Sequence, residues 1–328
     1  MLAISSGQGS LSLVSKAFSG GVGGVVLTGG AHVTAASLKD EITNLDSLSP
    51  GGVIPLLMAD EEGGGVEVLS PLVGQMPWPR TMARTMSPAQ VESLAFKVGK
   101  AMRDIGVTVD LGPVVDLDAG PGPSTSNPDG SRSFSANPSV ATEYAGAFEA
   151  GLEKAGVIPV LKHFPGLGGG ASGNTDFMAA HTVPYNVLLH GGLVPFEKLA
   201  SNAKAVMISN ASIPGLTNGV PSSLSSKAIG LLRKVVGFQG VAITDSLETV
   251  SIASYQPNLF QAVVDAARAG ADMIMLASSD PNQVPDYLGA RNALSQAIAS
   301  GAISRAAAEE SVGRILALKG FASSCIYY

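Results

Sequence analysis

PSVATEYAGAFEAGLEKAGVIPVLKHFPGLG, residues 138–168, contains the unit that decides the fold. Residues 138–156 show a helical pattern that ends in glycine, a common C-terminal stop of helices. Residues 157–161 form a short apolar run, which is typical of a buried strand, and the polar residues Lys162 and His163 follow at once. A helix that leads into a buried strand predicts one repeat of a parallel sheet, with polar chemistry at the point where the strand ends.

The same alternation runs along the whole chain. The strand candidates are residues 1–5, 23–29, 53–60, 107–116, 157–163, 203–210, 240–245 and 271–278. Helical patterns lie between them, among others at residues 88–106, 138–156, 222–237 and 259–270, and a last one covers 304–321. Eight strands in strict alternation with helices predict one α/β domain over residues 1–328, a single (β/α)8 TIM-type barrel, rather than an open doubly wound sheet.

Composition limits the possible partners. The chain has 328 residues, of which 45% are hydrophobic and 14% charged, and its formal net charge is −6, which argues against nucleic acid or an anionic membrane surface as the main partner. No apolar run approaches the roughly 20 residues that span a bilayer. The single cysteine, Cys325, permits no intrachain disulfide and no thiolate metal cluster. Met1 is followed by LAISSG without a basic segment, so no signal peptide is predicted as the sequence stands; compartment and oligomeric state stay open.

Polar residues gather where the predicted strands end, which is the place of the active site in such barrels. They are Asp60, Glu61 and Glu62 after the third strand, Asp116 and Asp118 after the fourth, Lys162 and His163 after the fifth, Ser209 and Asn210 after the sixth, and Asp245 after the seventh.

In their order along the chain, these segments resemble glycoside hydrolase family 3, in particular its single-domain β-N-acetylglucosaminidase branch. The matching segments are ADEEGG (59–64), LGPVVDLD (111–118), SRSFSANP (131–138), KHFPGLG (162–168), VMISNASIPGL (206–216), residues 221–247, AGADMIML (269–276) and SVGRILALK (311–319). The resemblance implies an exo-glycosidase that hydrolyses terminal β-linked N-acetylglucosamine in a glycan or cell-wall fragment. It also implies that no metal and no organic cofactor is needed.

Asp245 is the candidate nucleophile. Hydrolysis with retention of configuration needs a carboxylate nucleophile and a proton donor on either side of the glycosidic bond. Val241, Ile243 and Asp245 share one face of a strand, so the two apolar residues would anchor the aspartate at the barrel rim. The resemblance makes Asp245 the residue that forms a covalent glycosyl-enzyme. The alternative is an N-cap of the following helix.

The resemblance also assigns the sugar-binding residues: Asp60, Arg132, Lys162 and His163 would hold the hydroxyl and acetamido groups. Adjacent strand residues point to opposite faces, so we expect the strand to end where Lys162 and His163 lie. The alternatives are a structural Asp60–Arg132 ion pair and a core histidine bonded to the backbone. Supporting hydrogen bonds, not catalysis, are expected of Glu62, Asp116, Asp118 and Asp272.

The proton donor is the part of the pattern that this sequence changes. In the family branch an aspartate and, two positions later, a histidine form a donor dyad on a loop. Asp176 takes the aspartate's place, but Met178 stands where the histidine is expected, and Leu167 replaces a further histidine. Three alternatives stay open: His181 acts as the donor, Asp176 is itself the acid, or the chain has no donor.

A second change concerns ADEEGGGVEVL (59–69), where Gly65 and Val68 replace arginines of the family and one contact to the sugar is expected to be absent. The changes motivate two alternatives to an N-acetylglucosaminidase. One is a catalytically weak or inactive sugar-binding homologue, and the other is a β-glucosidase or another exo-glycosidase on the same scaffold.

Overall fold

The structure is a computed structural model that describes residues 2–5, 15, 17–28, 34–167, 172–277 and 283–321. Its main sheet has seven parallel strands in the order β1–β2–β3–β6–β7–β8–β9. These strands are β1 (Leu2–Ser5), β2 (Gly24–Thr28), β3 (Leu56–Ala59), β6 (Val109–Asp110), β7 (Ile158–Phe164), β8 (Ala205–Ile208) and β9 (Val241–Thr244). A small antiparallel hairpin, β4 (Glu61–Gly63) and β5 (Val66–Glu67), follows β3.

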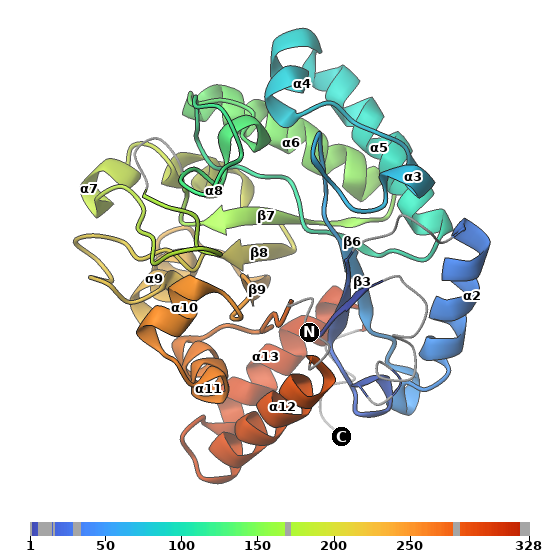
Figure 1. The fold of residues 1–328 in the computed structure, drawn as a ribbon, viewed down its shortest axis with the longest axis vertical. Helices are drawn as coiled ribbons and strands as arrows, with labels where there is room; N and C mark the ends of the chain where they lie inside the picture. The colour runs from blue at the N-terminus through green and yellow to red at the C-terminus, as the bar shows by residue number, and fades with distance from the viewer. Residues whose placement is uncertain are drawn as a thin grey trace.

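Helices surround the strands, as Figure 1 shows. They are α2 (Ala35–Asp46), α3 (Ser70–Val73), α4 (Pro79–Thr85), α5 (Pro88–Asp104), α6 (Pro138–Lys154), α7 (Tyr185–Leu188), α8 (Leu193–Leu199), α9 (Ser226–Lys234), α10 (Val250–Tyr255), α11 (Leu259–Ala269), α12 (Gln283–Ala299) and α13 (Arg305–Leu318). Short 3₁₀ turns lie at η1 (Pro50–Gly52), η2 (Gly130–Arg132) and η3 (Ser222–Leu224).

The predicted eighth strand, residues 271–278, is only partly present in the described residues. Met273 forms a parallel bridge with Ile243 of β9, and the Thr244 amide donates to the Met273 carbonyl at 2.9 Å. Met273 and Met275 also join the interior core, which contains buried side chains from β2, β3, β6, β7, β8 and β9. One apolar cluster that receives side chains from every side of a curled parallel sheet is the interior of a barrel. The predicted fold class is therefore confirmed.

The predicted fourth strand is shorter than expected. Residues 107–116 yield only β6, because Pro113 has no amide hydrogen to give to a neighbouring strand. The chain nevertheless stays beside β7: the Lys162 amide donates to the Pro113 carbonyl at 3.2 Å, and the Val115 amide donates to the Lys162 carbonyl at 2.8 Å. Asp116 thus reaches the end of β7 although it lies outside a regular strand.

Helices α5 and α6 show why this sequence packs tightly around the barrel. Ser87 caps α5 by accepting from the Gln90 amide, and Asn137 caps α6. A Cβ atom at Gly151 of α6 would lie 2.3 Å from the Glu92 carbonyl oxygen of α5, so only glycine permits this approach.

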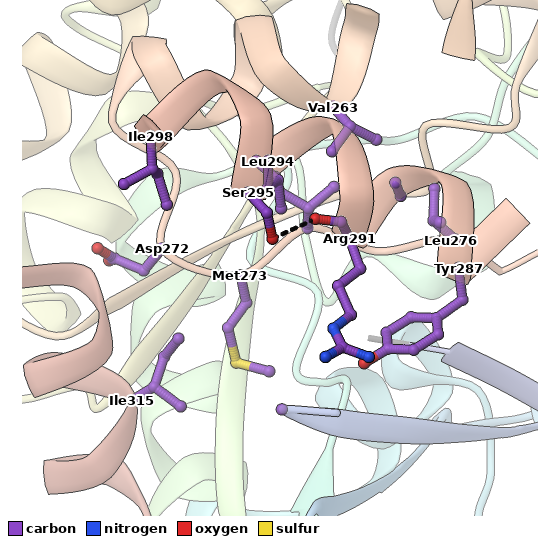
Figure 2. A pocket seen from close by; sticks show the side chains of 13 residues that line it. Val263, Asp272, Met273, Leu276, Tyr287, Arg291, Leu294, Ser295, Ile298 and Ile315 are labelled. Atoms are coloured by element: carbon purple, nitrogen blue, oxygen red, sulfur yellow. Dashed lines mark hydrogen bonds between the residues drawn. The ribbon is translucent and has the colours of Figure 1, made fainter. Parts of the chain in front are cut away.

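A cavity of about 260 Å³ lies in the outer wall, between α11, α12, α13 and residues 272–276. Figure 2 shows its mainly apolar lining, with Tyr287 and Arg291 of α12 at one side and Met273 at its base. None of the predicted catalytic or sugar-binding residues lines it. Among the helices of the described residues, none combines the length and apolarity needed to cross a bilayer. Cys325 lies outside the described residues, and the prediction of one domain over residues 1–328 stays a prediction.

Candidate active site

Asp245 stands at the barrel mouth, directly after β9. Val241 and Ile243 point into the barrel interior. The Asp245 amide continues the ladder by donating to the Ile208 carbonyl at 2.8 Å, so strand alternation directs the Asp245 side chain toward the same interior face. Its Oδ1 accepts from the Ser246 amide at 2.7 Å. The N-cap alternative is wrong, because α10 begins at Val250 and is preceded by Thr249 as its N-cap.

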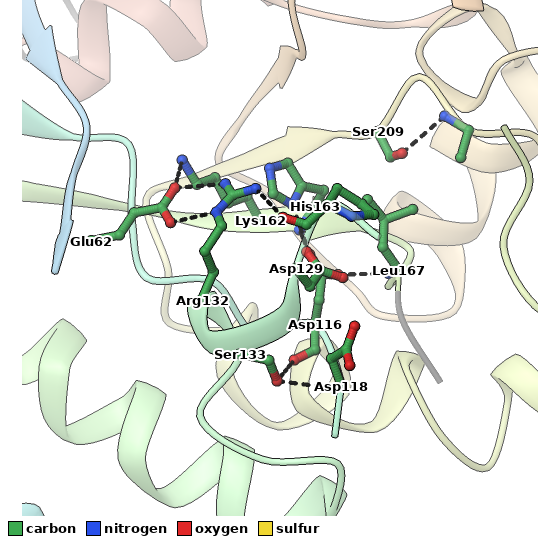
Figure 3. Close-up of polar contacts among 12 residues, drawn as sticks. Glu62, Asp116, Asp118, Asp129, Arg132, Ser133, Lys162, His163, Leu167 and Ser209 are labelled. Carbon is green, nitrogen blue, oxygen red and sulfur yellow. Dashed lines mark hydrogen bonds and ion pairs between the residues drawn. The ribbon is translucent and has the colours of Figure 1, made fainter. Parts of the chain in front are cut away.

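Four side chains beside this mouth alternate in charge. Lys162 Nζ lies 2.6 Å from Asp60 Oδ1 and 2.5 Å from Glu62 Oε1. Arg132 donates from Nε and Nη2 to the two oxygens of Glu62, each at 2.7 Å, which is a bidentate pair. The order Asp60, Lys162, Glu62, Arg132 thus reads minus, plus, minus, plus; we call this set the charge chain, and Figure 3 shows its three inner members. The expected alternative of an Asp60–Arg132 ion pair is wrong, since each residue has another partner.

Burial makes the charge chain rigid. The Lys162 and Glu62 side chains are 3% and 0% exposed, whereas the Asp60 side chain is 30% exposed. Burial alone would raise the pKa of Glu62, but the charges of Arg132 and Lys162 outweigh it and lower this pKa to about 2. Burial would likewise lower the pKa of Lys162, but Asp60 and Glu62 raise it above its ordinary value. Glu62, Lys162 and Arg132 are therefore charged at neutral pH.

His163 is held by a different partner, Asp116. Its Nδ1 lies 2.7 Å from Asp116 Oδ2, and its backbone amide donates to the same oxygen at 2.9 Å. Burial and the nearby charges of Arg132 and Lys162 lower the pKa of His163 to about 4, so the ring is neutral at neutral pH. A carboxylate on Nδ1 fixes the proton there and leaves Nε2 as an acceptor for a hydroxyl group. The alternative of a core histidine bonded to backbone is therefore wrong.

The end of β7 differs from the expectation. The strand continues past Lys162 and His163 to Phe164, but its register against β8 shifts between Leu161 and Phe164, and the Lys162–His163 peptide is cis. The register shift interrupts the strict alternation of side chains. Both Lys162 and His163 consequently contact polar groups of the mouth (Figure 3).

The two donor candidates lie in different surroundings within residues 172–181, which we call the donor loop. Asp176 is exposed. Burial raises the pKa of Asp245, His163 opposes this shift, and the charge of Asp176 adds to it. His181 instead places Nδ1 2.7 Å from Ser172 Oγ and lines a separate cavity of about 200 Å³ with Ser212 and Tyr255. The structure therefore brings Asp176, and not His181, into electrostatic contact with the candidate nucleophile.

The two missing arginines have local explanations. Trp78 covers the turn of the β4–β5 hairpin, and a Cβ atom at Gly65 would lie 2.8 Å from its ring. Any side chain at residue 65 would displace this ring. Val68 packs against the main apolar core and is partly buried. The chain has thus exchanged polar side chains at both positions for apolar packing around the hairpin.

The sequence interpretation missed two residues of this site. Glu62 was expected to be only supporting, yet it is the shared partner of Lys162 and Arg132. Asp129 was not considered, although it is completely buried next to Asp116 and His163. A signal for Glu62 existed in its place beside Asp60 at a strand end, but the sequence held no signal for Asp129, since it lies in a loop whose path only the fold reveals.

A tetrahedral zinc ion does not fit this arrangement. Single ligand atoms of Asp116, Asp129 and His163 lie within 4.8 Å of one another. However, His163 Nδ1 and Asp116 Oδ2 are only 2.7 Å apart, which is a hydrogen-bond distance. Two ligands about 2.1 Å from one tetrahedral ion are separated by roughly 3.3 Å.

Comparison with known proteins agrees with this architecture. The Glycosyl hydrolase family 3 N terminal domain matches residues 12–318, so the chain belongs to this family and is a glycoside hydrolase.

Among individual proteins, the chain is 38% identical over 283 residues to Beta-hexosaminidase LpqI of Mycobacterium tuberculosis, which covers 84% of this chain and 71% of the relative. It is also similar to the solved structure of a family 3 glycosyl hydrolase from Mycobacterium smegmatis, with 34% identity, a TM-score of 0.87 and coverage of 98% and 94%. A family 3 β-N-acetylglucosaminidase from Paenibacillus has 25% identity and a TM-score of 0.85 over 100% of this chain and 62% of that one.

Proposed function

We propose that this protein is a retaining exo-β-N-acetylglucosaminidase that acts on terminal β-linked N-acetylglucosamine in a glycan or cell-wall fragment. The observation that carries the proposal is the position of Asp245, at the end of β9 and within electrostatic reach of Lys162 and His163. The names of the relatives, which are β-hexosaminidases and a β-N-acetylglucosaminidase, supply the substrate class.

Sugar binding follows from the charge chain and His163. Asp60 accepts from a sugar hydroxyl, because it is the most exposed member of the charge chain and Lys162 holds its Oδ1 at 2.6 Å. Lys162 and Arg132 retain N–H donors that Asp60 and Glu62 do not use, and these can bind hydroxyl or acetamido oxygens. His163 Nε2 accepts from a further hydroxyl. Charged donors and acceptors that are already oriented recognise a polar ring with little loss of entropy on binding.

The chemical steps use Asp245 and Asp176. A carboxylate oxygen of Asp245 bonds the anomeric carbon while the glycosidic C–O bond breaks, and the protonated carboxyl of Asp176 gives its proton to the leaving oxygen. Asp176 then takes a proton from water, which attacks the anomeric carbon and releases Asp245. The nearness of Asp176 to Asp245, which appears as an electrostatic interaction between the two carboxyl groups, is the observation that favours it over His181 as donor.

An aryl glycoside assay tests the proposal. We expect hydrolysis of an aryl β-N-acetylglucosaminide, with the β anomer of the sugar as first product by NMR, and much slower hydrolysis of the matching aryl β-glucoside. Preference for the glucoside would make the protein a β-glucosidase. Binding of N-acetylglucosamine without turnover of either compound would make it an inactive sugar-binding homologue.

A further inference from the structure

Asp129, just before η2, is a buried acid that the proposed chemistry does not use. Its side chain is completely shielded from solvent, and among the described residues neither carboxylate oxygen has a hydrogen-bond donor. An ionised carboxylate in that position is expensive, because burial removes its hydration and nothing replaces it. Asp129 must therefore carry a proton, and its partner must be another acceptor such as a second carboxylate.

The group that faces Asp129 is the carboxylate of Asp116, with the His163 ring beside both. Asp116 is already supplied with donors: Oδ1 accepts from the Leu167 amide at 2.7 Å, and Oδ2 accepts from the amide and ring of His163. Of the two acids, Asp116 is thus the one stabilised as an anion. A proton placed on Asp129 turns two repelling charges into a carboxyl–carboxylate hydrogen bond.

The charged surroundings agree with one proton shared by the pair. Burial and the charge of Asp116 raise the pKa of Asp129 well above its ordinary value, with Asp118 adding to this and His163 and Arg132 opposing it. Burial also raises the pKa of Asp116, to about 7, against the donors from Leu167 and His163. The remaining charges near His163 are Lys162 and Asp245, from β7 and β9.

We propose that Asp129 stays protonated and donates to Asp116, and that this bond fixes Asp116 so that it holds the His163 ring with Nε2 directed to the sugar. Asp129 is then a positioning residue that acts through Asp116 and His163. The role in sugar binding depends on the function proposed above, but the effect on the His163 ring does not.

Two variants with side chains of similar size show whether Asp129 acts as a hydrogen-bond donor to Asp116 or only fills space. Asp129→Asn keeps an N–H donor toward Asp116 and cannot lose a proton, whereas Asp129→Leu removes the donor. Calorimetry with N-acetylglucosamine should give an affinity within about threefold of wild type for the Asn variant and about tenfold weaker for the Leu variant, the loss expected of one charge-assisted hydrogen bond. The wild-type affinity should fall at alkaline pH, where Asp129 ionises, and the Asn variant should lack this fall.

A second measurement needs no sugar and no activity. The chain has only four histidines, so ¹⁵N NMR can follow the His163 ring in the whole 328-residue chain. Wild type and the Asn variant should both show a neutral ring with the proton on Nδ1, and the Leu variant should show a shifted or mixed tautomer. This result would stand even if the protein proved not to bind N-acetylglucosamine.

Three outcomes would overturn the inference. The first is a Leu variant that keeps the wild-type ring signal and affinity. If that variant does not fold, an Asn variant with the same alkaline fall as wild type is the second. The third is a loss of affinity on chelation that Zn²⁺ restores, which would make the three residues a metal site.

Discussion

The two sides of the barrel mouth are built in opposite ways. The charge chain is buried at Lys162 and Glu62 and partly exposed at its two ends, and every member has an ionic partner at 2.7 Å or less. The donor loop is largely exposed, and among the described residues Asp176 makes no ion pair; its amide donates to Asn174 Oδ1 at 3.0 Å. A sugar-binding surface must be preorganised, whereas a donor has to approach and leave the glycosidic oxygen. The difference suggests that binding is robust in this protein and that proton donation is the step most easily lost.

Asp245→Asn should have the largest effect on turnover. Asp245 belongs neither to the charge chain nor to the donor loop, and it acts only as the nucleophile that bonds the anomeric carbon. We expect a loss of turnover of at least about a thousandfold on aryl N-acetylglucosaminide, since the amide cannot form the glycosyl-enzyme. Affinity for N-acetylglucosamine should be nearly unchanged. Asp265→Asn in α11, where the partly exposed aspartate pairs with Arg268, is the control and should keep wild-type turnover. Unchanged turnover in Asp245→Asn would contradict the assignment.

Glu62→Gln should break the charge chain at its centre. Two buried cations, Lys162 and Arg132, would lose a shared anion, and breaking a buried pair costs about 3–5 kcal/mol. Urea unfolding should show that decrease in the free energy of unfolding. Glu92→Gln is the matched control: Glu92 pairs with the exposed Lys154, and an exposed pair is worth about 0–1 kcal/mol. Equal losses in both variants would show that the charge chain is no more stabilising than a surface pair.

Asp176→Asn should sharpen the contrast from the side of the donor loop. Turnover of a natural disaccharide should fall about a hundredfold or more, the usual contribution of a general acid. Turnover of an aryl substrate with a good leaving group should fall much less in the glycosylation step, because that oxygen leaves without a proton. His181→Gln is the parallel variant and should have little effect on either substrate. If His181→Gln shows the selective loss instead, the donor is His181.

The effect that is smallest at each step of its measurement, a single pH unit, concerns Glu61, next to the charge chain. Burial, followed by the charges of Asp110, Glu67 and Asp60, raises the pKa of Glu61 from 4.5 to about 9, against the donor from Leu69. Between these values the unfolded chain loses a proton that the folded protein keeps, so stability falls as pH rises.

Glu61→Gln should remove this dependence. Relative to the variant, wild type should lose on the order of 1 kcal/mol per pH unit between pH 5 and pH 9, measured by urea unfolding at several pH values. A difference between the two proteins that does not change with pH would mean that Glu61 is already ionised in the folded state.

The sequence was sufficient for the parts of the fold that depend on periodicity. Strands β8 and β9 and helices α5 and α6 lie inside their predicted ranges, because apolar runs and glycine stops determine them locally. The β4–β5 hairpin was not predicted, since its residues carry no alternating pattern and its turn is shaped by contact with Trp78.

For the site, the sequence motifs indicated which residue types are present but not which of them contact one another. Asp60 and Arg132 were predicted near each other, but Glu62 and Lys162 separate them in the charge chain. Partners that are far apart in sequence are chosen by the positions of whole strands, and a single sequence does not contain this information. For the same reason Asp129 became visible only when its loop was seen against Asp116.

Covalent trapping tests the central claim most directly. A 5-fluoro glycosyl fluoride of N-acetylglucosamine should form a long-lived glycosyl-enzyme, because fluorine next to the ring oxygen slows its hydrolysis. Peptide mass spectrometry should then find the added sugar on Asp245, and no adduct in Asp245→Asn. A sugar attached to Asp60, Asp176 or another carboxylate would contradict the account, as would turnover of this compound that releases the inverted sugar without any adduct.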